Sequence, residues 1–92
     1  MNVDWDPAKD RANQRKHGIR FELARAVFDD PDRVELFDDR DYGEERWVAI
    51  GAVGRSILFV VYTMRHGGIR LISARKADRD DEDDYYESKA WR

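Results

Sequence analysis

The pattern of hydrophobic and polar positions changes character near residue 33. Before it, apolar residues recur at helical spacing, and Phe21, Ala24, Val27 and Phe28 share one face of a helix. After it, short apolar runs alternate with turn-forming residues, which is typical of strands. From Asp78 onward the chain is polar and acidic. The pattern therefore predicts an α+β fold, with helices first, a sheet next and a helix last.

Two N-terminal helices are expected. Asp6 suits an N-cap, Pro7 the first helical position and Gly18 the left-handed residue after the last turn. The first helix should therefore run from Pro7 to just before Gly18. The second should cover residues 21–30, because Pro31 ends it.

The middle of the chain predicts an antiparallel meander of three to five strands. In the segment 56–64, apolar residues occupy both faces of the predicted strand, so this strand should be central. Residues 33–37 should form an edge strand. A C-terminal helix should begin near Asp78, since carboxylates in the first turn complement the helix dipole. At 92 residues, one domain spanning 1–92 is expected. The other predicted strands are residues 46–51, 69–74 and a short one at 3–5, with turns at 53–56 and 66–68.

The charge is unevenly distributed. The net charge is −3, yet no Asp or Glu occurs from Arg46 to Ala77. Such a distribution favours an anionic ligand for this stretch, whatever the total charge. Its cations are Arg46, Arg55, Arg65, His66, Arg70, Arg75 and Lys76.

Composition excludes several classes of protein. The chain has no cysteine and only two histidines, which rules out disulfides and thiolate metal sites, and we expect no metal and no cofactor. The longest apolar run, residues 57–62, is too short to span a bilayer. The first ten residues lack the pattern of a signal peptide, so a cytoplasmic protein without membrane contact is expected.

Antiparallel pairing of the predicted strands groups the cations. Residues flanking a hairpin turn lie at the same end of the sheet, and strand starts fall beside the ends of their neighbours. The residues alone leave open which group is catalytic. The two expected foci are Arg46, Arg65 and Arg70 at one end, and Arg55, Arg75 and Lys76 at the other.

Short motifs spread over nearly the whole chain resemble one family. In order they are WDPAK (5–9), Asn13, KHG (16–18), Phe21, the run 24–31, GEER (43–46) and ISARKA (72–77). Together they resemble a BrnT-type toxin of a bacterial type II toxin–antitoxin system. The resemblance implies a RelE-like fold and a ribonuclease that arrests translation. It also implies neutralisation by a BrnA-type antitoxin in a 2:2 heterotetramer that reaches operator DNA only through the antitoxin. One departure is Arg20, which cannot accept an N-cap hydrogen bond before the second helix.

A metal-independent ribonuclease must deprotonate the ribose 2′-hydroxyl, neutralise the phosphorane and protonate the leaving 5′-oxygen. Arginine suits the phosphate because its planar fork binds two oxygens and stays charged. The candidate catalytic residues are Arg46, Arg65, Arg75, Glu45 and His17, and the candidate RNA-binding residues are Arg55, Arg70, Lys76 and Lys16.

Each candidate also has a structural alternative. Arg75 could pair with Asp78 or Glu82, and Arg46 could pair with the preceding glutamates. His17 lies at a helix C-terminus, where the dipole alone favours a cation. The competing hypothesis is therefore a non-catalytic binding module, or an inactive toxin copy, whose basic face docks an acidic partner.

Overall fold

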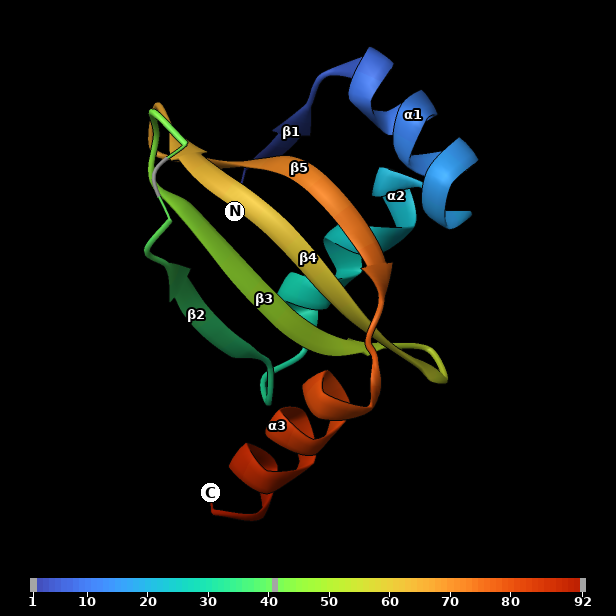
Figure 1. Cartoon of the computed structure of the whole chain (residues 1–92), viewed down its shortest axis with the longest axis vertical. Coiled ribbons are helices and arrows are strands. Elements are labelled where there is room, and N and C mark those ends of the chain that lie inside the picture. The colour runs from blue at the N-terminus through green and yellow to red at the C-terminus, as the bar shows by residue number, and fades with distance from the viewer. Residues whose placement is uncertain (1, 41, 92) are drawn as a thin grey trace.

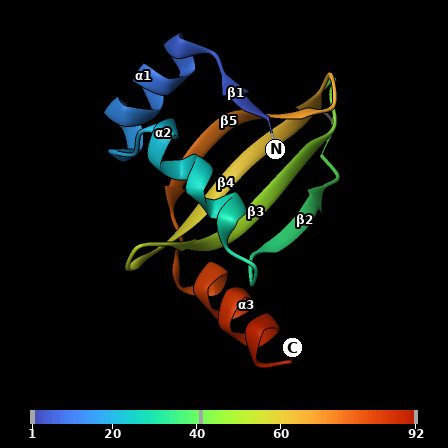
Figure 2. The same cartoon turned by 180° about the vertical axis from the view of Figure 1, so that it is seen from behind.

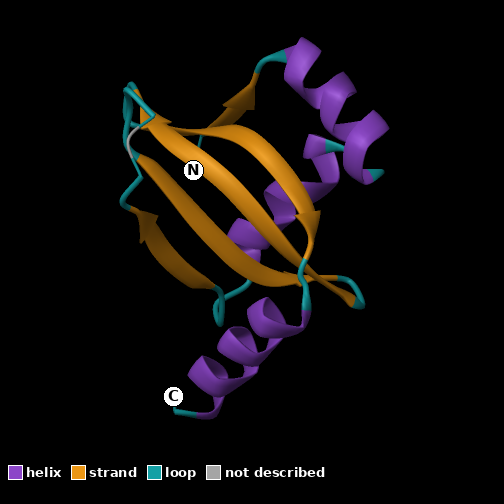
Figure 3. Cartoon of the chain, in the orientation of Figure 1, coloured by secondary structure: helices purple, strands orange, loops and turns teal. Residues whose placement is uncertain are grey.

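A single five-stranded sheet organises the computed structural model, which describes residues 2–40 and 42–91 (Figures 1 and 3). The strand order is β1-β5-β4-β3-β2. The strands are β1 (Val3–Trp5), β2 (Val34–Asp38), β3 (Arg46–Val53), β4 (Ser56–Arg65) and β5 (Gly68–Lys76). The helices are α1 (Pro7–His17), α2 (Phe21–Ala24), the 3₁₀-helix η1 (Arg25–Asp29) and α3 (Arg79–Ala90).

Strands β2 to β5 form the predicted antiparallel meander, with β4 near its middle and β2 at an edge. Strand β1, however, pairs with β5 in parallel, with Val3 opposite Ile69 and Trp5 opposite Leu71. The expectation of a purely antiparallel sheet is therefore wrong, and the sheet is mixed. No short turn joins β1 to β5, so hairpin geometry does not fix their relative direction.

The first helix begins and ends where the sequence predicts. The Asp6 side chain accepts a hydrogen bond from the Ala8 N–H at 2.9 Å, and Gly18 closes the helix with φ 72°. The second predicted helix is wrong in type beyond Ala24, because η1 continues it as a 3₁₀-helix. Arg20 provides no cap, and the Phe21 N–H donates instead to Asp10 Oδ1 at 2.9 Å.

The back of the sheet is covered by α2 and η1, while α1 lies beside the β5 edge (Figure 2). Gly51 permits the close approach of η1, because an added Cβ would lie 3.3 Å from the Val27 carbonyl oxygen. The buried cluster on this side contains Ile19, Phe21, Ala24, Val27, Phe28, Ala49, Leu58, Val60, Tyr62, Ile69, Leu71 and Ala74.

Of the described elements, α3 alone lies on the front of the sheet, where it packs against one end (Figure 1). Tyr85 is buried there beside Val48 and Ile50, and its hydroxyl donates to Asp30 Oδ2 at 2.6 Å. Asp78 caps α3, as expected from the acidic block. Nothing else in residues 2–40 and 42–91 forms an element that covers the rest of the front face.

Candidate functional site

Four arginines share the open front of the sheet. Residues paired across strands lie on the same face, and successive residues alternate. Phe59, Thr63 and Arg65 lie on the front face of β4. Arg70 pairs with Thr63 and Arg75 with Phe59, so both arginines of β5 also lie on the front. Arg46 alternates with the front residues Val48 and Ile50. We call Arg46, Arg65, Arg70 and Arg75 the arginine face.

Glu44 joins two members of the arginine face. Its carboxylate lies 3.7 Å from Arg46 Nη2 and 3.2 Å from Arg65 Nη2. The Arg46 guanidinium also stacks on the Tyr42 ring at 4.0 Å, and its buried Nε has no hydrogen-bond partner among the described residues. The Thr63 hydroxyl donates to the Glu45 carbonyl at 2.6 Å. The loop before β3 is thus fixed against the end of the sheet.

The other two arginines are paired individually. Arg70 Nη1 lies 3.4 Å from Asp4 Oδ1. Arg75 donates to Asp81 Oδ2 at 2.8 Å and lies over the Phe59 ring at 3.9 Å. Asp81 is therefore its partner, and the alternative pairing with Asp78 or Glu82 is not formed.

The pairs of Arg65 and Arg70 position their guanidinium groups without neutralising them strongly. The Arg65 side chain is 52% exposed and that of Asp4 is 61% exposed. Ion pairs this exposed contribute about 0–1 kcal/mol each, so a phosphate can compete for the arginine. Three carboxylates, those of Glu44, Asp4 and Asp81, face four guanidinium groups.

Asp38 adds a further carboxylate opposite Arg46 on β3. Its oxygens accept hydrogen bonds from Arg40 and from the Tyr42 hydroxyl. The Arg40 side chain is the main reason that the pKa of Asp38 lies well below its usual range, despite the opposing effect of desolvation. Asp38 is thus ionised at neutral pH, and it lies on the same face as Arg46, engaged with Arg40 and Tyr42.

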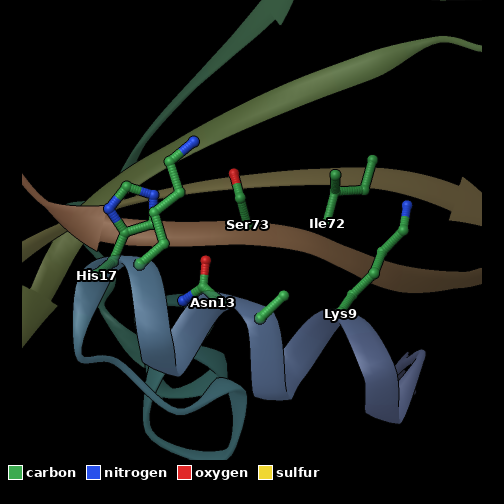
Figure 4. Close-up of a pocket in the computed structure, with 7 residues that line it drawn as sticks. Lys9, Asn13, His17, Ile72 and Ser73 are labelled. Carbon is green, nitrogen blue, oxygen red and sulfur yellow. The ribbon is translucent and has the colours of Figure 1, made fainter.

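A pocket of about 330 Å³ lies between α1 and β5 (Figure 4). The Asn13 amide forms its base and binds the β5 edge as a strand would: Nδ2 donates to the Ala74 carbonyl, and Oδ1 accepts from the Ala74 N–H. The same Nδ2 also donates to the Ile19 carbonyl at 2.9 Å. The pocket is lined by Lys9, Ala12, Asn13, Lys16, His17, Ile72 and Ser73.

The geometry can now be compared with known proteins. Residues 5–81 match the family model described as "Ribonuclease toxin, BrnT, of type II toxin-antitoxin system". The chain belongs to this family. Membership in a BrnT toxin family implies an antitoxin partner. A search among curated proteins gave no match. The whole arginine face lies inside the matched residues, whereas most of α3 lies beyond them.

The structure brings together part of the first predicted group of cations. Arg46 and Arg65 meet at Glu44, and Arg70 lies on the next strand, opposite Thr63. The second focus is wrong as a single cluster. Lys76 pairs with the back-facing Leu58, so it points away from Arg75, because neighbouring strand residues alternate.

Arg55 lies exposed in the turn between β3 and β4, so its assigned role in RNA binding stays a prediction, as does that of Lys76. Lys16 and His17 lie together in the pocket, at the end of α1.

Three residues of these sites were not among the candidate site residues named from the sequence. Glu44 is the carboxylate held among the arginines, whereas the Glu45 side chain is exposed and its carbonyl accepts from the Thr63 hydroxyl. The signal was the two-residue spacing of Glu44 from Arg46, which places both on one side of an extended chain. Lys9 could have been found from its helical spacing to Asn13 and Lys16. Tyr42, which supports Arg46, lies in an irregular loop, and no sequence periodicity marks it.

Two further observations describe the chain's surroundings. Within residues 2–40 and 42–91, no three His, Asp or Glu side chains gather in a way that could hold a metal ion. No helix in the same residues is long and apolar enough to cross a membrane.

Proposed function

We propose that this chain is an endoribonuclease toxin that cleaves RNA without a metal ion and thereby inhibits translation. The observation that carries the proposal is the arginine face, an open surface of four guanidinium groups inside the matched part of the chain. One guanidinium group can bind two oxygens of the same phosphate, and the RNA backbone presents such phosphates.

The proposed reaction is attack of the ribose 2′-oxygen on the adjacent phosphorus. The new 2′-O–P bond forms as the P–5′-O bond breaks, leaving a 2′,3′-cyclic phosphate and a 5′-hydroxyl. Arg46 and Arg65 neutralise the charge that develops on the phosphorane oxygens. Arg75 and Arg70 bind flanking phosphates.

A general base must remove the 2′-hydroxyl proton, and an acid must protonate the 5′-oxygen. We assign the base to Glu44, since its carboxylate lies within 4 Å of the two arginines proposed to hold the phosphate. Glu45 remains the competing candidate for this role. His17, the acid candidate named from the sequence, lines the pocket between α1 and β5 and not the group of Glu44, Arg46 and Arg65, so we do not place it at the reacting phosphate. Arg55, Lys76 and Lys16 are proposed to contact RNA outside the reacting phosphate.

The antitoxin partner follows from the same surface. We propose that a BrnA-type antitoxin covers the arginine face with an acidic or mixed-charge segment, a complementarity that speeds association and selects the partner. The assembly is proposed to be a 2:2 heterotetramer with a RelE-like toxin, acting in the cytoplasm and binding operator DNA through the antitoxin alone. Analytical ultracentrifugation of the co-expressed pair should give the 2:2 mass, and a 1:1 mass would contradict this stoichiometry.

Expression of the chain with and without its neighbouring gene tests the function. We expect growth arrest and loss of RNA integrity from the chain alone, and normal growth when the neighbour is co-expressed. Purified protein should cut RNA at the same rate in EDTA as in its absence. Intact RNA under both conditions, with normal growth, would refute the ribonuclease. Cleavage that EDTA abolishes would refute metal independence alone.

A non-catalytic binding module is the second candidate. The observation in its favour is that every arginine of the face already has a carboxylate partner. Such a module predicts that R65Q/R75Q abolishes formation of the protein complex, while the unmodified chain leaves RNA intact. RNA cleavage by the unmodified chain would exclude it.

A further inference from the structure

Helix α1 contacts the sheet through polar side chains. The face it turns toward β5 carries Lys9, Asn13, Lys16 and His17, and Asn13 is the buried residue of this helix. A helix beside a sheet ordinarily presents an apolar stripe at this spacing. The polar stripe leaves a pocket where a packed interface would otherwise form.

The edge of β5 explains why the pocket exists. Strand β1 pairs only with residues Ile69 to Leu71, so the rest of this edge has no strand beside it. The Asn13 amide takes the place of a strand at Ala74. Between these two points, Ile72 is the extra residue of a bulge, because Leu71 pairs with Tyr62 and Ser73 with Val61. Ile72 and Ser73 therefore face the pocket along an uncovered stretch of edge.

The side chains that line the pocket fit a ligand that has a negative charge and also an apolar surface. Lys9, Lys16 and His17 supply nitrogen donors and Ser73 a hydroxyl, and no carboxylate is among the lining residues. The nearest acidic residue on the inward half of α1, Asp10, is engaged by the Phe21 N–H and by Gln14. Ala12 and Ile72 complete the lining with apolar surface. A phosphate with its attached sugar and base matches this combination in size and chemistry.

The pocket also lies next to the arginine face. Ser73 pairs with Val61, so it belongs to the front of the sheet, two positions from Arg75 on the same strand. We propose that the pocket binds one nucleotide of a single-stranded RNA that continues from the arginine face across the β5 edge. This inference rests on the proposed ribonuclease function and adds a second binding site to it.

The test measures RNA binding as a function of salt. The probe is an oligoribonucleotide with 2′-O-methyl groups throughout, which binds but cannot be cut by its own 2′-oxygen. The variant K9Q/K16Q removes two pocket cations. Its matched control, R11Q/R15Q, removes two exposed cations of the same helix that do not line the pocket. Circular dichroism should show that both variants fold.

For single strands, each phosphate contact contributes about 0.7 to the slope of log K against log salt concentration. Because the pocket holds the phosphate of one nucleotide, we expect K9Q/K16Q to reduce the magnitude of this slope by about 0.7, and R11Q/R15Q to leave it unchanged. A third variant, Ser73→Leu, fills the pocket without changing charge, and should weaken binding at low salt. Equal slopes for K9Q/K16Q and R11Q/R15Q would overturn the proposal.

Two further arms separate this inference from the proposed function. If the wild-type protein cleaves unmodified RNA but K9Q/K16Q and R11Q/R15Q have equal slopes, the ribonuclease function is supported and the pocket does not bind RNA. If the protein neither cleaves nor binds RNA, both the ribonuclease function and the proposed nucleotide site are refuted. Titration with 5′-AMP, followed by NMR, identifies a site for free nucleotides. Shifts at Ser73 with 5′-AMP, but equal slopes with RNA, would also overturn the proposal.

Discussion

Single residues decide how the arginine face is held. Glu44 is shared between Arg46 and Arg65, and the Tyr42 ring supports Arg46 from below. A carboxylate between two guanidinium groups orients both of them. The same residue is therefore suited to hold the arginines before RNA binds and to accept a proton afterwards.

The glutamates of the loop give the first prediction. Glu44→Gln keeps the shape of the side chain but removes the charge and the proton acceptor, so we expect the single-turnover rate of RNA cleavage to fall at least about 100-fold. Glu45→Gln should cost at least about tenfold less, since its side chain points to solvent. Glu87→Gln, on the exposed side of α3, is the control. If Glu45→Gln lowered the cleavage rate more than Glu44→Gln, the general base would be Glu45.

Asn13 gives the second prediction. Asn13→Ala leaves the N–H and carbonyl of Ala74 and the carbonyl of Ile19 without their partner in a buried site. We expect the free energy of unfolding to fall by about 2–4 kcal/mol, because buried unpaired backbone groups cost about 1–3 kcal/mol each and solvent recovers part of this.

Urea denaturation of Asn13→Ala should be compared with Gln14→Ala, an exposed neighbour on the same helix. We expect Gln14→Ala to change the stability by less than about 0.5 kcal/mol. A loss below about 1 kcal/mol for Asn13→Ala would show that the side chain does not close the β5 edge.

At the scale of elements, the carboxylate of Asp30 joins α3 to the sheet, in addition to the Arg75–Asp81 ion pair. Asp30 Oδ2 accepts from the Tyr85 hydroxyl at 2.6 Å and from the Ala52 N–H at 2.8 Å, while Oδ1 accepts from the Asp32 N–H. Burial raises the pKa of Asp30, but these hydrogen bonds outweigh burial and hold it below the ordinary value of 3.8. The contact therefore joins α3 to β3 and to the segment before β2.

The third prediction concerns this contact. Tyr85→Phe removes the hydroxyl and keeps the ring, so the unfolding free energy at pH 7 should fall by about 1–3 kcal/mol. Tyr86→Phe is the control, because Tyr86 is 55% exposed. Chemical denaturation measures both. Equal stability of the two variants would mean that the Asp30–Tyr85 bond adds nothing to the docking of α3.

The fourth prediction is the pH dependence of the same pair. Because the folded-state pKa of Asp30 is lowered, its stabilising contribution is present above the unfolded value of 3.8 and is lost as the pH falls through the lower folded value. Burial, followed by the hydrogen bond to Asp30, raises the pKa of Tyr85, so its contribution is lost as the pH rises above 10.0.

The difference in unfolding free energy between wild type and Tyr85→Phe should therefore be constant near neutral pH. It should shrink below about pH 4, because Asp30 then becomes protonated in both proteins. Unfolding free energies measured from pH 2 to pH 8 test this. A difference that stays constant down to pH 2 would exclude an ionised Asp30 as the acceptor.

The elements also show what sequence could and could not predict. Capping residues and two-residue periodicity predicted α1, the meander and the start of α3, because these signals are local. The second helix was predicted too long, since its change to 3₁₀ geometry accompanies the packing of η1 over Gly51, a tertiary contact. The direction of β1 was missed for the same reason, as its pairing with β5 joins distant parts of the chain.

At the scale of the whole molecule, the fold separates a covered back from an open, arginine-bearing front (Figures 1 and 2). The carboxylate-free stretch from Arg46 to Ala77 predicted a basic surface, and strand alternation selects which cations it contains. The bulge at Ile72 shifts the alternation along β5, so that Arg75 lies on the front with Arg70 and Lys76 lies on the back. The α1–β5 pocket could not be predicted, because it depends on where β1 stops pairing with β5.

The arginine face as the RNA-cleaving surface is the central claim, and single-turnover cleavage of a defined RNA by R46Q/R65Q tests it most directly. The same measurement on R11Q/R15Q controls for the loss of two positive charges. We predict that R46Q/R65Q lowers the rate at least about 100-fold while R11Q/R15Q stays within about threefold of wild type. Folded R46Q/R65Q that cleaves as fast as R11Q/R15Q would contradict the claim.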